Sequence, residues 1–570
     1  MMKKLADRYV VGELVLAAAA ALILSGCGDS ISDATSSSLS TAAPSPAVSW
    51  QLPAGELPLG PPGLQEARTT TQVSPGVTYY QITRGQAAST DSWTVTVQFA
   101  KTQIAAAPAA AAMAAAGYQV RYDPAGTGPD GSPLGFNVSI GQYATQAAAQ
   151  AVATAIAQQT SNAYKPTVRN TGLDGNASST GPWLVNVLAI SPTFKGNLQN
   201  IIAGGNASGS GGMLGTGGET PQATAARLGA IAAINSGFWS TNANPAGVQL
   251  KGAASTIVSN GKLEGMAANG EPGVSFAQVD GHPTVAFLPN LSTTVTVTSA
   301  NGTSTPIVAF NSSILGQIFN CGSPDETPAP ERAHDYTCTN YNDLVLYDSN
   351  FNGGLTSSTT VDPGYSGPTY EVLVSSNGQV LSGSATLGAP PPNGGYALQG
   401  LGTSAAWLQQ NAPVGTALTV ASQVQSNNAP VTLSPGVSLT AAGPTLLPAA
   451  TVQERAVTEG WSPDYAGVDR SSFYWGWFNA RNPRTMIGTA ADGTILLVET
   501  DGRQPGLALG TTIQETANVM EWLGASKAIN LDGGGSSAMI VNGADVGHPS
   551  DSAPANPTQR AVASSIVLTR

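Results

Sequence analysis

The chain has 570 residues, enough for roughly two to four domains with substantial cores. Charged residues make up only 10% of it, against roughly 25% in ordinary domains, so its surface must be largely uncharged and polar, which suits an extracytoplasmic protein. The formal net charge is −12, and because nucleic acids and anionic membranes attract basic faces, we exclude both as electrostatic partners. Any bound phosphate must therefore be held by local arginines.

The N-terminal segment has the features of a secretion signal. Basic residues precede an apolar run over residues 14–24, which is too short to span the roughly 30 Å hydrocarbon core of a membrane. Residues 24–27, Leu-Ser-Gly-Cys, match a bacterial lipobox. We therefore predict a lipoprotein signal over residues 1–27, lipidation of Cys27, and an exported protein that is lipid-anchored to the bacterial membrane, in the periplasm or at the cell surface.

Residues 28–90 are rich in Ser, Thr, Pro and Ala and contain few large apolar side chains. Such a segment buries too little apolar surface to offset its conformational entropy. We predict a disordered tether over residues 28–90.

A strand–helix–strand rhythm then occurs twice between residues 91 and 172. The alternating and helical patterns predict four strands and two Ala-rich helices, namely strands at 93–99, 118–122, 136–140 and 165–169, a helix that ends at 116 and a helix at 145–158. This βαββαβ order predicts a small ferredoxin-like domain over residues 91–172.

The stretch Phe136–Tyr143, followed by Ala147, resembles the SPOR domain, whose family binds the glycan strands of peptidoglycan. The resemblance implies peptidoglycan as a partner of this domain. The alternative interpretation is a spacer domain without a ligand.

A larger, β-rich mixed α/β domain is predicted over residues 183–570, which makes the whole chain α+β. Its expected elements are strands at 183–190 and 494–498, helices at 223–233 and 515–523, a Gly- and Ser-rich loop at 204–218, and many short strands between 256 and 450. The first of these helices would deliver Asn235.

Cys321 and Cys338 are the cysteines that remain after processing at Cys27. In an oxidising compartment we expect them to form one disulfide that closes the polar loop between them. A metal site would need more ligands than His334 offers, and no histidine has metal-ligand spacing. We therefore expect neither a metal nor another cofactor.

The most informative stretch covers residues 528–537, where Asp532, three glycines and two serines follow a β-like run. Consecutive glycines allow positive φ or a close approach of another group, and exposed amides in such a turn can bind an anion. Asp532 offers a carboxylate for acid/base or nucleophilic chemistry. The competing interpretation is a hairpin turn between strands at 528–531 and 538–541.

Several neighbouring motifs extend this pattern. They are Arg481-Asn-Pro-Arg484, Asp501-Gly-Arg503, Gly510 to Glu515, Pro549-Ser-Asp551 with Arg560, and the earlier Ile234-Asn235-Ser236-Gly237-Phe238-Trp239. Together with Asp532 they resemble the phosphodiester glycosidase family, one of whose members removes N-acetylglucosamine from a sugar-phosphate diester. Ser236 and Trp239 depart from the Asn-Gly-Gly-Phe-Phe element of that family.

The resemblance implies a hydrolase that acts on glycosyl bonds. Cleavage between sugar C1 and phosphate needs a carboxylate at C1 and cations at the phosphate. Asp532 and Asp501 fit the first role, with Glu515 as a third candidate. Arg484 and Arg503 fit the second role, because a guanidinium matches phosphate oxygens with two parallel hydrogen bonds.

Further residues are expected to bind sugar hydroxyls or the phosphate: Asn235, Asn530, Gly533, Gly534, Ser536, Ser537 and Arg560. Four candidates also have structural alternatives. Arg484 can form an ion pair at a strand end, Asp501 can shape a turn, Glu515 can cap a helix with Thr511 or Thr512, and Arg560 can form a salt bridge within the site.

Three functional hypotheses follow. The first is a hydrolase of sugar-1-phosphodiesters in envelope polymers or exopolysaccharide. The second is a peptidoglycan-binding lipoprotein whose glycosidase-like domain is inactive. The third is an enzyme that transfers a sugar or cleaves another glycan linkage.

Overall fold

The computed structural model describes nine stretches of the chain, namely residues 50–175, 179–204, 218–243, 249–266, 270–322, 325–329, 332–448, 452–551 and 558–570. Within these stretches no helix is both long and apolar enough to cross a membrane. The predicted signal, Cys27 and most of the loop at 204–218 lie outside the described residues.

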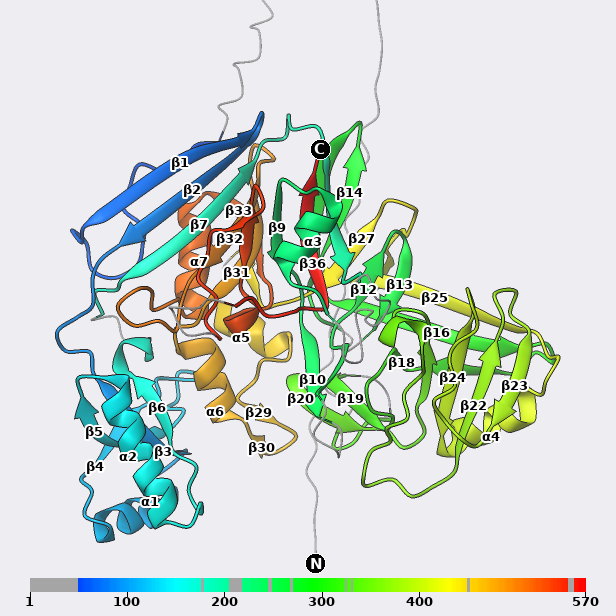
Figure 1. Ribbon diagram of the computed structural model, residues 1–570, viewed down its shortest axis with the longest axis horizontal. Coiled ribbons are helices and arrows are strands. Elements are labelled where there is room, and N and C mark those ends of the chain that lie inside the picture. Colours follow the sequence, from blue (N-terminus) through cyan, green and yellow to red (C-terminus); the bar gives the residue numbers. More distant parts are fainter. Residues whose placement is uncertain are drawn as a thin grey trace, which may run out of the picture. The chain divides into compact units, whose positions relative to one another are not determined.

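A seven-stranded antiparallel sheet supports the C-terminal motifs (Figure 1). Its strands, in spatial order, are β1 (Glu66–Ser74), β2 (Val77–Arg84), β7 (Trp183–Ile190), β32 (Ile495–Thr500), β31 (Arg484–Ala490), β33 (Ala525–Asn530) and β28 (Thr445–Leu447). Every residue of β7 and β32 is buried, as expected for strands that are covered on both faces. Helix α7 (Ile513–Trp522) packs on β33 and β28.

The first two strands of this sheet correct the predicted tether. β2 pairs with β7 from Val77↔Ile190 to Arg84↔Trp183, and Leu57 is fully buried. The tether predicted over residues 28–90 is therefore wrong from residue 50 onwards. Average composition concealed a β-branched and aromatic strand whose partner lies far along the chain, and only that long-range pairing buries it.

The small domain is inserted between β2 and β7. It consists of β3 (Trp93–Ala100), α1 (Gln103–Ala115), β4 (Val120–Pro124), β5 (Phe136–Tyr143), α2 (Gln146–Gln159) and β6 (Thr167–Asn170). Its antiparallel sheet has the order β4-β5-β3-β6, so the predicted βαββαβ unit is confirmed as a fold. The larger domain, predicted to begin at residue 183, also includes the strands that precede the insertion.

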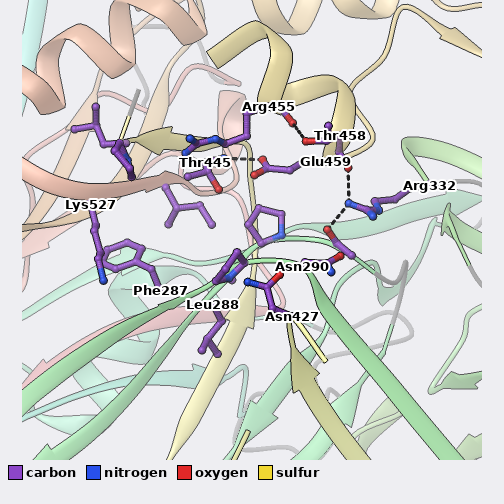
Figure 2. A pocket seen from close by; sticks show the side chains of 17 residues that line it. Phe287, Leu288, Asn290, Arg332, Asn427, Thr445, Arg455, Thr458, Glu459 and Lys527 are labelled. Carbon is purple, nitrogen blue, oxygen red and sulfur yellow. Dashed lines mark hydrogen bonds between the residues drawn. The ribbon is translucent and has the colours of Figure 1, made fainter. Parts of the chain in front are cut away.

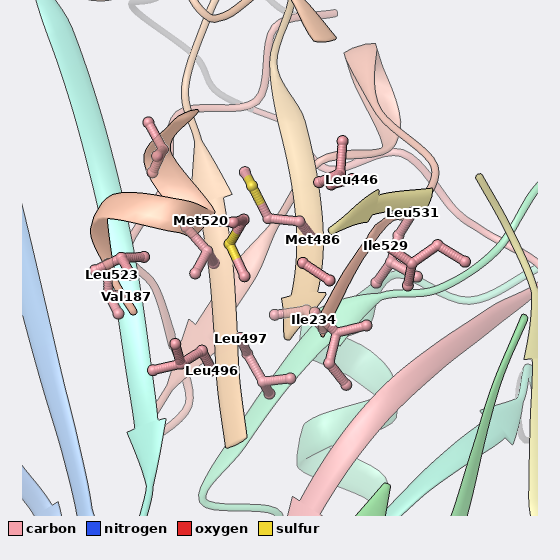
Figure 3. Close-up of a cluster of buried hydrophobic side chains, with 14 of the residues drawn as sticks. Val187, Ile234, Leu446, Met486, Leu496, Leu497, Met520, Leu523, Ile529 and Leu531 are labelled. Atoms are coloured by element: carbon pink, nitrogen blue, oxygen red, sulfur yellow. The ribbon is translucent and has the colours of Figure 1, made fainter. Parts of the chain in front are cut away.

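A second, five-stranded antiparallel sheet lies next to the first (Figure 1). Its strands, in order, are β35 (Ala544–Asp545), β34 (Met539–Val541), β9 (Ala232–Asn235), β36 (Ser564–Thr569) and β8 (Asn197–Ile202), and α3 (Pro221–Leu228) packs against it. One apolar cluster joins the two sheets (Figure 3), because Val187, Met486 and Leu497 of the first sheet belong to the same core as Ile234 of the second. The two sheets therefore form one rigid base for the segment that crosses between them.

The middle of the chain is β-rich, as predicted, and forms three further sheets. The first sheet contains β12 (Ile257–Ser259), β13 (Lys262–Gly265), β14 (Gly273–Val279), β15 (His282–Leu288) and β27 (Ser438–Ala441). The second sheet contains β16 (Leu291–Ser299), β17 (Ser304–Ile307), β25 (Leu418–Ser426) and β26 (Ala429–Pro430). The third sheet contains β18 (Ala309–Phe310), β21 (Leu344–Tyr347), β22 (Thr369–Val374), β23 (Val380–Ser384) and β24 (Tyr396–Leu401), and α4 (Gly402–Asn411) packs on it. The α+β class is thus confirmed.

Short elements complete the described fold. They are the two-stranded ribbons β10 (Trp239–Ala243) with β11 (Gln249–Ala253), β19 (Gln317–Cys321) with β20 (Ala333–Thr339) and β29 (Asp464–Tyr465) with β30 (Val468–Asp469), the helices α5 (Val452–Thr458) and α6 (Ser471–Tyr474), the π-helical turn η3 (Trp475–Asn479), and the 3-10 turns η1 (Thr171–Leu173), η2 (Asn352–Gly354) and η4 (Gly534–Ser536).

Candidate active site

The glycine-rich turn after Asp532 connects two sheets. β33, before the turn, pairs with β31, whereas β34, after it, pairs with β9. The interpretation as a hairpin turn is therefore wrong. The backbone N–H of Asp532 donates to the carbonyl of Ser236 at 3.0 Å, which fixes the crossing segment to the end of β9.

Two asparagines that were predicted to contact substrate instead hold this segment in place. Asn235 is fully buried, donates from Nδ2 to the carbonyl of Asp532 at 2.7 Å and accepts from the Thr485 hydroxyl at 2.7 Å. Asn530 is also fully buried and donates to the carbonyl of Gly443 at 2.8 Å. Their burial argues against a direct contact with substrate.

The backbone amides of the turn are largely occupied. Gly533 donates to Oδ1 of Asp532 at 2.8 Å, and Gly534 donates to the carbonyl of Pro483 at 2.9 Å. Ser536 and Ser537 donate to carbonyls within the turn, both at 3.2 Å. These amides do not form the open anion-binding concavity that the sequence suggested, so a phosphate at this site depends on side-chain cations.

The Asp532 side chain is partly buried, and its surroundings raise its pKa. Burial raises the pKa of its carboxyl to about 6, and the negative charge of Asp335 adds to the rise. Hydrogen bonds from Ser536 and Gly533 and the charge of Arg560 oppose it. A carboxyl with a pKa near neutrality suits a general base or nucleophile, because it is mostly ionised at pH 7 and still accepts a proton readily.

Asp335 is a second carboxylate at this site, and the sequence did not single it out. It lies on β20 with a φ of +53°, and its backbone N–H donates to Oδ1 of Asn320 on the paired strand at 2.6 Å. The Asp335 side chain is exposed. In the sequence, Asp335 is recognisable only as an acidic residue between two cysteines. That pattern does not indicate which part of the protein the Asp335 side chain would face.

The ribbon that carries Asp335 is firmly anchored. The predicted disulfide is confirmed, because Cys321 on β19 is bonded to Cys338 on β20, with their Cα atoms 5.6 Å apart. His334 stacks on Trp461 with ring centroids 3.7 Å apart. Burial holds the pKa of His334 well below its ordinary value, so it packs as a neutral aromatic ring.

The group of Cys321, Glu326 and Cys338 is the set of three potential metal ligands found among the described residues. The two sulfur atoms are bonded to each other, so they offer no thiolate to a metal.

Arg503 is the cation that lies against the turn. Its backbone has a φ of +58°, and Nε donates to Oδ1 of Asn482 at 2.9 Å. A methyl group on Gly534, which itself has a φ of +62°, would lie 3.1 Å from both terminal nitrogens of Arg503, so glycine permits this close approach. Across the described chain these terminal nitrogens have no hydrogen-bond partner, which leaves them available for an anion.

Arg484 has a different environment from the one we predicted. It is fully buried at the start of β31, donates from Nε to the carbonyl of Thr511 at 3.1 Å, and also donates to the carbonyl of Trp477. The Trp477 ring covers its guanidinium at 4.5 Å. Burial and the charge of Arg503 lower the pKa of Arg484 to about 9. The Trp477 ring therefore covers the charged group of Arg484. Arg484 donates hydrogen bonds to carbonyls and does not form the strand-end ion pair that was the alternative prediction.

Asp501 is paired with His548. Its buried carboxylate accepts from the His548 backbone N–H at 2.8 Å and contacts His548 Nδ1 at 2.5 Å. The hydrogen bond with Asp501 raises the pKa of His548, whose side chain remains 43% exposed. Burial and the charge of Asp501 raise the pKa of the neighbouring Glu499 well above its ordinary value. Asp501 can therefore act on a substrate only through His548, a residue that the sequence interpretation missed.

Glu515 and Arg560 follow their structural alternatives. Glu515 forms a capping box with Thr512 and a salt bridge with buried Arg481 at 2.7 Å. Arg560 donates from Nε to Asp551 at 2.7 Å and from Nη1 to the Ser536 hydroxyl at 3.3 Å. Arg560 therefore stabilises the turn from the side of Ser536, whereas Glu515 belongs to the helix terminus.

A cavity of about 580 Å³ lies beside β33 (Figure 2). Lys527, Arg332 and Glu459 are among its lining residues; Glu459 accepts from the Thr445 N–H at 2.8 Å, and Arg332 donates to the carbonyls of Gly270 and Thr458. Because its walls contain none of the predicted site residues, this cavity is not part of the candidate active site.

The sequence profile of the phosphodiester glycosidase family matches residues 370–569, so the predicted resemblance to this family is confirmed over that part of the chain. The matched region contains Arg484, Arg503, Asp532 and Arg560, but Asn235 and Asp335 precede it.

Among solved structures, the chain is similar to a "putative exported protein" from Burkholderia pseudomallei, with 47% identity, a TM-score of 0.85, and coverage of 91% of this chain and 99% of that one. A hypothetical protein from Synechocystis has 17% identity, a TM-score of 0.48, and coverage of 89% and 79%. The catalytic domain of zebrafish N-acetylglucosamine-1-phosphodiester alpha-N-acetylglucosaminidase has 15% identity, a TM-score of 0.21, and coverage of 55% and 89%. No curated protein matches the chain.

Proposed function

We propose that the protein is an extracytoplasmic glycoside hydrolase that cleaves the bond between sugar C1 and phosphate in sugar-1-phosphodiesters of envelope polymers or exopolysaccharide. The observation that carries this proposal is the arrangement around Gly534. Asp532, with a pKa of about 6, comes directly before the turn, and the terminal nitrogens of Arg503, which have no hydrogen-bond partner among the described residues, lie against Gly534. The match of residues 370–569 to the phosphodiester glycosidase family profile supports hydrolysis of a glycosyl bond.

In this mechanism Arg503 binds the phosphate and Asp532 acts at C1, either as the nucleophile or as the base that activates water. As the bond breaks, C1 gains oxocarbenium character and the phosphate gains negative charge. Arg503 and the buried charge of Arg484 stabilise that charge, while the ionised Asp532 stabilises the sugar. Asp335 is the second carboxylate, and its separation from Asp532 in a complex with substrate decides between inversion and retention.

We propose His548 as the proton donor to the departing phosphate, because its carbonyl accepts at 2.8 Å from the side chain of Gln504, the residue next to Arg503. Its pKa is raised by the hydrogen bond with Asp501, so it is protonated to a higher pH than an ordinary histidine. Asp501 then acts as a positioning residue, because its two oxygens fix the backbone and the ring of His548.

A chromogenic sugar-1-phosphodiester tests the function directly. The full mature protein should release free sugar and a phosphomonoester, and Asp532→Asn should abolish most of that release. The exposed Asp280, at a hairpin end with a φ of +52°, provides the matched control, because Asp280→Asn should leave turnover unchanged. Release of sugar 1-phosphate with an alcohol would show cleavage of the other ester bond and refute the proposal.

We further propose that the protein is exported and anchored through a lipid on Cys27. The lipobox supports this, and the similar protein from Burkholderia pseudomallei is named as exported. Metabolic labelling with a radioactive fatty acid should mark the wild type but not Cys27→Ala. Equal labelling, or equal recovery of both proteins in the membrane fraction, would exclude this anchor.

The SPOR-like sequence of the inserted domain supports a weak contact with the glycan strands of peptidoglycan. The full protein should co-sediment with purified peptidoglycan. A protein in which Arg84 is joined directly to Trp183 by a short turn, and which therefore lacks the inserted domain, should not. Equal sedimentation of the two would leave the domain without this partner.

A further inference from the structure

A cavity of about 310 Å³ lies between the inserted domain and the π-helical turn η3. The inserted domain and the segment that follows it contribute Trp93, Asn170 and Asp174, and the larger domain contributes Trp475, Asn482 and Arg503. The volume is at the lower end of the roughly 300–1,000 Å³ range of small-ligand sites. Two parts of the chain that are separate in sequence thus share one cavity.

The cavity begins at the proposed phosphate site. Arg503 forms part of its wall, and the terminal nitrogens of the same arginine face Gly534. Neither Asp532 nor any residue of the glycine-rich turn lines the cavity. Because Arg503 belongs both to the proposed phosphate site and to the cavity wall, a substrate whose C1 is at Asp532 and whose phosphate is at Arg503 can extend its leaving group into this cavity.

The apolar parts of the cavity wall include two indole rings. Trp93 and Trp475 are both half-buried, so part of each ring remains accessible. Trp475 is held by Phe99, with ring centroids 6.1 Å apart, and by Arg169, whose guanidinium is 5.9 Å from the ring. A fixed indole offers a flat apolar surface on which the C–H face of a sugar ring can stack.

Two polar side chains of the wall, Asp174 and Asn170, keep groups that are unpaired among the described residues. Oδ2 of Asp174 is paired with Arg169, whereas Oδ1 is buried and has no hydrogen-bond partner within the described stretches. Oδ1 of Asn170 accepts from the Gly172 N–H at 2.9 Å, and its Nδ2 has no bond to other described residues. An unpaired buried acceptor destabilises the protein, and a ligand hydroxyl that donates to it would remove this cost.

The charges of the cavity indicate a neutral ligand beyond a single phosphate. Arg169 is paired with Asp123 and Asp174, and Arg481 is paired with Glu515. Arg503 alone among the arginines that line the cavity has no carboxylate within salt-bridge distance in the described structure. One arginine of the wall without a carboxylate partner among the described residues matches one phosphate, and the rest of the wall matches hydroxyl groups.

We propose that this cavity is the leaving-group subsite and that it binds a neutral sugar esterified to the phosphate. The inserted domain thereby determines which phosphodiesters the enzyme accepts. The proposal rests on the proposed function for the position of the phosphate, but binding to the subsite can be measured without catalysis.

Calorimetry on the full mature protein with glucose 6-phosphate and with methyl phosphate provides the first test. Glucose 6-phosphate should bind roughly tenfold more tightly, which corresponds to about 1.4 kcal/mol. Trp475→Ala should remove most of this preference. Gln146→Ala should reduce it by roughly half, and because Gln146 is an exposed residue of the wall, this second variant should keep its fold. Trp522→Ala and Gln150→Ala, outside the cavity, are the matched controls and should keep the full preference.

A kinetic comparison separates the two proposals. For two diesters with the same glycosyl group, the ratio of kcat/KM for the glucose 6-phosphate leaving group to that for methyl phosphate should fall roughly tenfold in Trp475→Ala. Equal binding of the two phosphates, or a preference that survives in both cavity variants, would overturn the subsite whether or not the enzyme is active. A Trp475-dependent preference without turnover of either diester would support the subsite and refute the hydrolase.

Discussion

Replacement of Asp532 by asparagine should lower activity and raise stability at the same time. The carboxyl has a pKa of about 6 in the folded protein and an ordinary value of 3.8, so folding raises its pKa by about 2 units. At about 1.36 kcal/mol per unit, this shift corresponds to an upper value of about 3 kcal/mol, and solvent at a partly buried side chain reduces it towards half of that. Activity should fall by about 10²–10⁴-fold, as for loss of a positioned acid or base.

The direction of the stability change depends on pH. Because the folded-state pKa is the higher one, the carboxyl contributes most to stability below about pH 4, where it is protonated in both states, and this contribution is lost as the pH rises through about 6. Asparagine stays neutral throughout, and its Oδ1 can still accept from the Gly533 N–H. The variant should therefore be more stable than the wild type at pH 8 and about equal to it at pH 4.

Urea denaturation at pH 4 and pH 8, together with turnover of a sugar-1-phosphodiester, measures both effects. Asp280→Asn serves again as the control, since an exposed aspartate should give little change in either quantity. Lower stability of Asp532→Asn at pH 8 would refute the view that burial destabilises this carboxylate. Near wild-type turnover would show that Asp532 shapes the turn and takes no part in the reaction.

Three further predictions concern the neighbouring groups. Arg503→Ala should lower kcat/KM by roughly 10²–10³-fold. Arg503→Lys should recover only part of this loss, because lysine lacks the forked donors. Equal activity of the wild type and both variants would exclude Arg503 from the phosphate site. Asp501→Asn should lower the pKa of His548, so the alkaline limb of kcat/KM against pH should move to lower pH, and an unmoved limb would contradict the positioning role. Cys321→Ser should destabilise the protein by roughly 3 kcal/mol, as for a disulfide that closes a loop of about 15 residues. It should also lower turnover, because the ribbon that carries Asp335 becomes less rigid. An unchanged melting temperature would contradict the predicted loss of stability.

Short-range sequence patterns predicted the helices and strands that have a clear apolar or helical pattern of their own. The buried run at 183–190 is β7, and the Ala-rich segments of the inserted domain are α1 and α2. The patterns could not predict which strands become neighbours. The pairing of β2 with β7 depends on residues far apart in the chain, so the composition of residues 50–90 suggested a tether where the structure has a sheet edge.

In the candidate site, too, the sequence predicted the residues that belong to a local motif but not those whose role depends on long-range contacts. The glycines and Asp532 were recognised from their own turn, and Arg503 from the motif around it. Asp335 could not be found in this way, because its approach to the turn depends on a left-handed backbone residue in a disulfide-bonded ribbon. The role of Asn235 also depends on tertiary structure, since a buried amide that holds the backbone and an exposed amide that binds a sugar have the same sequence signal.

The position of the inserted domain limits where the chain can be shortened. A protein that began at Trp183 would lose β1 and β2 and would expose β7 as a long apolar edge with unpaired N–H and C=O groups, the kind of edge that promotes aggregation. Arg84 and Trp183 are paired neighbours on antiparallel strands, so a two-residue turn can join them. Separate production of the larger domain therefore requires excision of the insert with residues 50–84 retained.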